Sequence, residues 1–150
     1  ETVRQLTRRN WPDGVRIVDF GIRSYDLAYA MMDGYDAIIL VDATTRGNAP
    51  GTVYLIEPNL SELEQLDSVG IDAHSMNPVR VLQMVQSLGG QPGRLYLVGC
   101  EPGVLETENG EIGLSNNVRA AVPKAVEMIE SLIGNVLESK VETAAGLAPA

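Results

Sequence analysis

Three short, largely apolar runs along the chain each end at a carboxylate. They span residues 15–19, 37–42 and 95–101, and their terminal acids are Asp19, Asp42 and Glu101. A glycine follows each acid closely and marks a turn. Short runs of Val, Ile and Leu are typical of strands that are buried on both faces of a parallel sheet. We therefore predict three such strands, over 15–20, 36–42 and 94–100.

The segments between these runs carry apolar residues at helical spacing. They predict helices over 24–32 and 78–88, and a helix from Ser115 onwards that Pro123 kinks or restarts. A fourth apolar run at 52–56 follows a loop too short for a helical crossover, which favours an antiparallel neighbour. This alternation predicts an α/β fold with a mostly parallel, mixed sheet.

Residues 1–10 have the pattern of the end of a helix. Because a parallel α/β sheet normally has a strand ahead of such a helix, we expect an N-terminal strand that these 150 residues do not contain. We find no linker that would divide the chain. The prediction is one α/β domain over 1–143, incomplete on its N-terminal side, followed by a flexible tail over 144–150.

Sites in open α/β sheets form beyond the carboxyl ends of the strands, so the three acids should gather at one edge. Crowded ionised carboxylates repel each other, and something cationic usually compensates for them. His74 is the single histidine of the chain. It falls in a predicted loop over 67–77 that could reach this edge.

Each of these residues is open to more than one role. Asp42 could be a metal ligand, a general base or a phosphoacceptor, or it could bind the backbone of the following loop. Asp19 beside Gly21 permits close approach of another backbone but also suits a plain turn. Glu101, held extended by the next proline, also suits a surface loop. His74 could join carboxylates in an open nickel or zinc site, or be an ordinary polar side chain.

Composition narrows the classes of partner. The net charge of −9 argues against nucleic acid and anionic membranes, and no apolar run approaches the ~20 residues that span a bilayer. A single cysteine, Cys100, excludes an internal disulfide and favours a reducing compartment such as the cytoplasm. The sequence has no Gly-x-Ser-x-Gly elbow, which argues against a serine hydrolase. It also has no Gly-rich phosphate-binding loop.

Several segments, in order along the chain, form a recognisable set of motifs. They are Asp19-Phe20-Gly21, residues 36–43, Pro50-Gly51-Thr52-Val53, His74, Leu88-Gly89, Pro92, Val98-Gly99-Cys100-Glu101-Pro102 and Leu114-Ser115. With these motifs the sequence, over most of residues 1–135, resembles the maturation endopeptidases of nickel–iron hydrogenases, which implies a three-layer α/β/α sandwich around a mixed sheet. The match departs from the family at Ile22, where threonine is usual.

The resemblance also implies an activity. It is that of an aspartic-type endopeptidase, which removes the C-terminal extension of a nickel–iron hydrogenase large subunit after nickel insertion. Nickel carried by the substrate would be the recognition signal, with Asp42 and His74 as the catalytic and metal-facing residues. We assign Asp19, Gly21 and Glu101 to substrate recognition. A further acid of the family belongs to an N-terminal segment with Gly-Asn and Asp-Gly-x-Gly motifs, which these residues do not include.

Two other functions stay open. A phosphoacceptor signalling domain also clusters acids at strand ends, but it needs a lysine near the phosphoryl group, and Lys124 and Lys140 both fall on the predicted C-terminal helix. A non-catalytic metal-binding chaperone or adaptor could share the fold. Nickel binding without cleavage would favour the chaperone.

Overall fold

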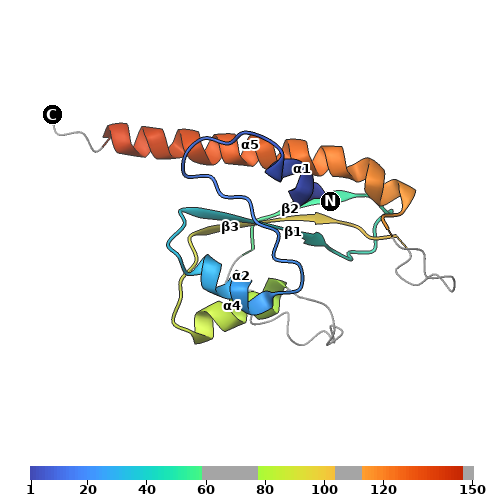
Figure 1. Cartoon of the computed structure of the whole chain (residues 1–150), viewed down its shortest axis with the longest axis horizontal. Helices are drawn as coiled ribbons and strands as arrows, with labels where there is room; N and C mark the ends of the chain where they lie inside the picture. The colour runs from blue at the N-terminus through green and yellow to red at the C-terminus, as the bar shows by residue number, and fades with distance from the viewer. Residues whose placement is uncertain (59–77, 104–112, 147–150) are drawn as a thin grey trace.

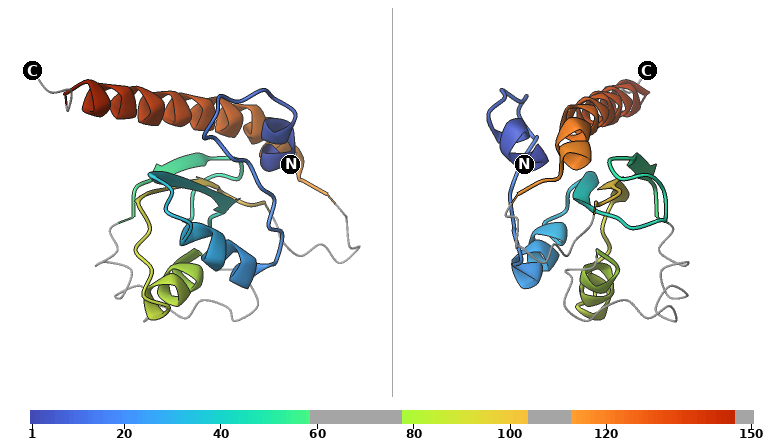
Figure 2. Two further views of the ribbon diagram at one scale, coloured as in Figure 1. Left: turned by 60° about the vertical axis from the view of Figure 1, so that its left-hand side comes forward. Right: turned by 90° about the vertical axis from the view of Figure 1, so that its right-hand side faces the viewer.

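Three layers make up the described part of the molecule. The computed structural model describes residues 1–58, 78–103 and 113–146, in which helices cover both faces of a three-stranded sheet (Figure 1). On one face lie α1 (Thr2–Thr7) and α5 (Asn116–Gly146), and on the other lie α2 (Ser24–Met31) and α4 (Pro78–Ser87), as Figure 2 shows. The predicted α/β/α sandwich is confirmed.

The sheet is mixed and has the order β1-β3-β2. β1 (Ala37–Ala43) runs parallel to β3 (Arg94–Cys100), and β2 (Val53–Ile56) runs antiparallel to β3. The short connection between β1 and β2 explains the antiparallel direction of β2, as predicted. In this register Asp42 and Tyr54 lie opposite Gly99 from its two sides.

Two apolar clusters attach the helices to the sheet. Because successive residues of a strand point to opposite faces, alternate residues of β1 and β3 enter alternate clusters. The cluster under α5 contains Leu6, Tyr96, Val98, Val122, Ala125, Val126, Ile129 and Leu132. The cluster at α2 and α4 contains Ala28, Met31, Leu40, Val81, Leu82, Val85 and Leu95. By this alternation Asp42 and Glu101 leave the sheet on the α2 and α4 face.

The predicted strand over residues 15–20 is wrong. This segment is not part of the sheet, and β1 pairs only with β3 among the described residues. An apolar run becomes a strand only when another strand offers backbone hydrogen bonds, and no described strand lies next to this one. The segment instead forms one wall of a cavity whose other walls include β1 and α5.

The C-terminal helix differs from its prediction at Pro123. Ser115 caps the helix as expected, since its Oγ accepts a hydrogen bond from the Val118 N–H at 3.4 Å. However, α5 is one continuous helix that contains Pro123. Burial of its apolar stripe on the sheet stabilises the helix on both sides of the proline. The helix also includes residues 144–146, which were predicted to be tail.

Candidate functional site

Asp42 is a half-buried acid near the end of β1. Its Oδ1 accepts a hydrogen bond from the Ala43 N–H at 2.8 Å. Burial raises the pKa of the Asp42 carboxyl, and the Ala43 hydrogen bond opposes this only in part. No cation forms an ion pair with it within residues 1–58, 78–103 and 113–146. A carboxyl with a raised pKa and no counter-ion is suited to take up a cation or a proton.

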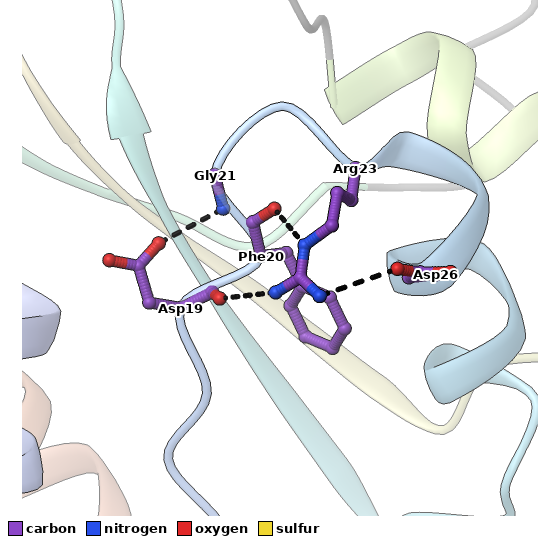
Figure 3. A network of polar contacts seen from close by, with 5 residues as sticks. All are labelled: Asp19, Phe20, Gly21, Arg23 and Asp26. Carbon is purple, nitrogen blue, oxygen red and sulfur yellow. Dashed lines mark hydrogen bonds and ion pairs between the residues drawn. The ribbon is translucent and has the colours of Figure 1, made fainter.

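Asp19 lies in a turn that is fastened to the start of α2 (Figure 3). The Gly21 N–H donates to Asp19 Oδ1 at 2.9 Å, and the φ of +55° at Gly21 favours glycine. Arg23 donates from Nη2 to the Asp19 carbonyl at 2.9 Å and from Nε to the Phe20 carbonyl at 3.1 Å. Its guanidinium also pairs with Asp26 at 3.5 Å, so the turn and the helix form one unit.

One cavity connects Asp19 with Asp42. It has a volume of about 700 Å³ and is bounded by residues 13–21, by β1, by α2 and by α5. Asp19 and Asp42 both contribute to its lining. The remaining walls are mostly apolar, and they include Ile17, Leu40 and Ile129. The structure therefore brings two of the three predicted acids to one cavity.

Glu101 follows β3 and is buried, with 4% of its surface exposed. Its Oε2 accepts a hydrogen bond from the Arg46 N–H at 2.9 Å, and its Oε1 accepts one from the Gly47 N–H at 3.2 Å. The Tyr54 hydroxyl donates to Oε2 as well. The Tyr54 hydrogen bond lowers the pKa of the Glu101 carboxyl, helped by the backbone N–H groups and opposed by burial. This side chain does not line the Asp19–Asp42 cavity.

His74 lies outside the described residues, so its place relative to Asp42 stays a prediction. The described elements do show where the neighbouring helix starts. α4 begins on the side of the sheet at which β1 and β3 end (Figure 1), and His74 lies shortly ahead of α4 in the sequence. Within the described ranges, no three His, Cys, Asp or Glu side chains come together as a metal site.

Two residues of this region have roles that the sequence analysis did not predict. Tyr54 appeared only as part of an apolar run, and its role depends on the antiparallel register that sets it diagonally across from Glu101. Arg23 appeared only as the residue before a helix. Its position a few residues after Asp19, ahead of the helix start, could have indicated an arginine that bonds to the carbonyl groups of the turn.

Comparison with known proteins assigns the family. The sequence model of the HycI family, described as hydrogenase maturation protease, matches residues 1–132. The chain is 33% identical to the hydrogenase 2 maturation protease of Escherichia coli over 119 residues, which are 79% of this chain and 69% of that protein. It is 30% identical over 130 residues to a provisionally named hydrogenase maturation protease of Methanocaldococcus jannaschii, covering 86% of this chain and 81% of that one.

Comparison of the fold with solved structures leads to the same family as comparison of the sequence. The solved structure of the hydrogenase maturating endopeptidase HybD from Escherichia coli superposes with a TM-score of 0.73 at 31% identity, covering 89% of this chain and 80% of that one. Among the described residues, no helix is both long and apolar enough to cross a bilayer. The chain belongs to the hydrogenase maturation protease family and is a peptidase.

Proposed function

We propose that the protein is the endopeptidase that removes the C-terminal extension of a nickel–iron hydrogenase large-subunit precursor after nickel insertion. The observation that carries the proposal is Asp42, an acid with a raised pKa and no ion pair among the described residues, which lines a cavity beside β1 in a chain of the maturation protease family. Nickel is part of the substrate in this proposal and acts as the signal that the precursor is ready.

Asp42 and His74 would contact the nickel-bearing end of the precursor. Carboxylate oxygen and neutral imidazole nitrogen are both suitable ligands for divalent nickel. In aspartic-type hydrolysis an acid accepts a proton from the attacking water as the water oxygen bonds to the carbonyl carbon. The C–N bond then breaks and a proton passes to the leaving amine. Burial raises the pKa of the Asp42 carboxyl, which makes its carboxylate a stronger base for this step.

Asp19 and Gly21 would recognise the substrate backbone. The Asp19 carboxylate is bonded through Oδ1 to the Gly21 N–H, and Oδ2 takes part in no hydrogen bond with the described part of the chain. A rigid turn with one open acceptor oxygen can receive a backbone N–H of an incoming peptide. The Arg23 hydrogen bonds hold this turn in place, which lowers the entropy lost on binding.

The test is cleavage of purified large-subunit precursor, with and without nickel, by the full-length protease. We expect cleavage of the nickel-loaded precursor only, and Asp42→Asn and His74→Ala to lower the rate at least ~100-fold. Asp33→Asn is the matched control, because this exposed acid does not itself line the Asp19–Asp42 cavity. Normal cleavage by both site variants would refute the assignment.

Nickel titration separates the proposal from a metal chaperone. The protease should bind free nickel weakly, because in this proposal the metal arrives with the precursor. Stoichiometric, tight binding of nickel sulfate by calorimetry, together with an intact precursor, would favour the chaperone. We also propose that the reaction takes place in the cytoplasm, since a lone cysteine suits a reducing compartment.

A further inference from the structure

We propose that Glu101 is a positioning residue for the cleavage reaction. Its carboxylate fixes the loop of residues 44–51 that follows Asp42, and Tyr54 stabilises the same arrangement. We call the groups around its carboxylate the Glu101 cradle, which consists of the Arg46 and Gly47 N–H groups and the Tyr54 hydroxyl. The inference rests on the proposed function of Asp42.

Burial and bonding set Glu101 apart from the other acids. It is the buried charged residue of the described part of the chain. Both of its carboxylate oxygens already accept hydrogen bonds, from three donors in all. A buried carboxylate is costly unless it is bonded in this way. Glu101 does not line the cavity that Asp19 and Asp42 share, so we assign it to the loop rather than to a substrate.

The backbone of Glu101 holds the far end of the same loop. The Glu101 N–H donates to the Thr52 carbonyl at 2.8 Å, and the Gly51 N–H donates to the Glu101 carbonyl at 2.9 Å. The side chain holds residues 46 and 47, and the main chain holds residues 51 and 52. One residue thus fixes the loop at its middle and at its end.

A continuous series of bonds joins the cradle to Asp42. The Ala43 N–H donates to the Asp42 carboxylate at 2.8 Å, and the Thr44 N–H donates to the Cys100 carbonyl at 2.9 Å. Arg46 and Gly47 then donate to Glu101. Each residue from 42 to 47 therefore either takes part in one of these hydrogen bonds or is next in sequence to a residue that does. Ala43 is the last residue of β1, so the loop adjoins the N–H group that donates to the Asp42 carboxylate.

Tyr54 adds two contacts to this arrangement. Its hydroxyl accepts a hydrogen bond from Asn48 Nδ2 at 2.9 Å while it donates to Glu101. The Arg46 guanidinium lies over its ring, 5.5 Å from the centroid. Three successive residues of the loop, 46–48, thus contact Glu101 or Tyr54. The antiparallel register of β2 on β3 places the tyrosine for this role.

The test compares Glu101→Gln and Tyr54→Phe in the full-length protease, with Glu57→Gln as the matched control. Glu57 is an exposed acid paired with Arg94, outside the cradle. Glutamine keeps the size of the side chain but presents N–H donors to the loop N–H groups. We expect Glu101→Gln to lower kcat about tenfold through misplacement of Asp42, with KM within about twofold of wild type. Tyr54→Phe should have a smaller effect, and Glu57→Gln should have none.

Amide hydrogen exchange, followed by NMR, reports on the cradle independently of activity. Exchange at Arg46 and Gly47 should accelerate at least tenfold in Glu101→Gln and less in Tyr54→Phe. Unchanged exchange in both variants, or faster exchange with unchanged kcat, would overturn the inference. A wild-type protease that leaves the nickel-loaded precursor intact would instead overturn the proposed function. The exchange rates tell these two failures apart.

Discussion

The two acids at the end of the sheet respond to pH in opposite directions, and Asp42 is the destabilising one. Its pKa in the folded protein is raised by burial. The folded state therefore keeps a proton at pH values at which the unfolded chain has lost it. The stability from this group is present below the unfolded pKa and is lost as pH rises through the folded pKa. At neutral pH an ionised Asp42 costs stability, as functional residues often do.

Asp42→Asn should therefore stabilise the protein at neutral pH. We expect a gain on the order of 1 kcal/mol in the free energy of unfolding, measured by urea denaturation at pH 7. The gain should shrink as pH falls below the folded pKa of Asp42, because the wild-type carboxyl is then also neutral. A loss of stability at pH 7 would show that the ionised carboxylate has a stabilising partner.

Glu101→Gln should show the opposite pH dependence. Its folded pKa is lowered, first by the Tyr54 hydrogen bond. The stability from this group is present above the unfolded pKa and is lost as pH falls through the folded pKa. We therefore expect Glu101→Gln to be less stable than wild type at pH 7 in the same urea titration, with the difference fading in acid. Equal stability at pH 7 would argue against the bonded cradle.

At the scale of elements, the loop between β1 and β2 meets the start of α5 at Gly51. The φ at Gly51 is +87°, and a Cβ there would lie 2.6 Å from the Asn117 carbonyl oxygen. Gly34 has a similar φ of +80° but nothing within 4 Å of its Cβ position. Substitutions at Gly51 and Gly34 therefore separate the cost of backbone strain from the cost of a steric clash. The contact at Gly51 is what packs the loop of the cradle against α5.

Substitution of both glycines by alanine measures this contact. Gly34→Ala should cost about 1 kcal/mol, the usual penalty for alanine at positive φ. Gly51→Ala should cost roughly 1–3 kcal/mol more, because the Asn117 backbone has to move. Thermal unfolding of the two variants gives the difference. Equal losses would mean that the loop shifts away from α5 without cost.

The elements also show what the sequence could predict. The runs at 37–43, 53–56 and 94–100 became strands because each has a partner within the described residues, and the short loop before Val53 gave the antiparallel direction. The run at 15–20 has the same local pattern, yet no strand in the described ranges pairs with it. Pairing is a property of two segments, so composition could not decide it. The prediction at Pro123 failed for a related reason, since packing on the sheet decides the course of α5.

The candidate site also contains some residues whose place could be predicted from the sequence and others whose role could not. Asp42 was predictable, since an acid near the end of a strand lies at one edge of a sheet. Asp19 lines the same cavity, although the segment that carries it is not a strand. The role of Glu101 could not be predicted from the sequence. It depends on the Arg46 and Gly47 N–H groups of a loop far away in sequence and on the register that brings the Tyr54 hydroxyl to it. The place of His74 stays a prediction.

At the scale of the whole molecule, one edge of β1 has no partner strand among the described residues. The apolar cavity of about 700 Å³ lies along that free edge, between β1 and residues 13–21. A free strand edge beside apolar surface is a site for pairing with another chain. The polypeptide of residues 1–150 should therefore self-associate through this edge.

Val18→Lys tests that association, because Val18 lines the cavity beside the free edge. A charge placed there should oppose pairing and raise the monomer fraction, as charged residues do on natural edge strands. Val141→Lys is the control, since Val141 is 69% exposed on α5 and does not line the cavity. Light scattering of the 1–150 polypeptide over a concentration series measures the effect. A wild-type monomer at every concentration would show that the 13–21 segment already protects the edge of β1.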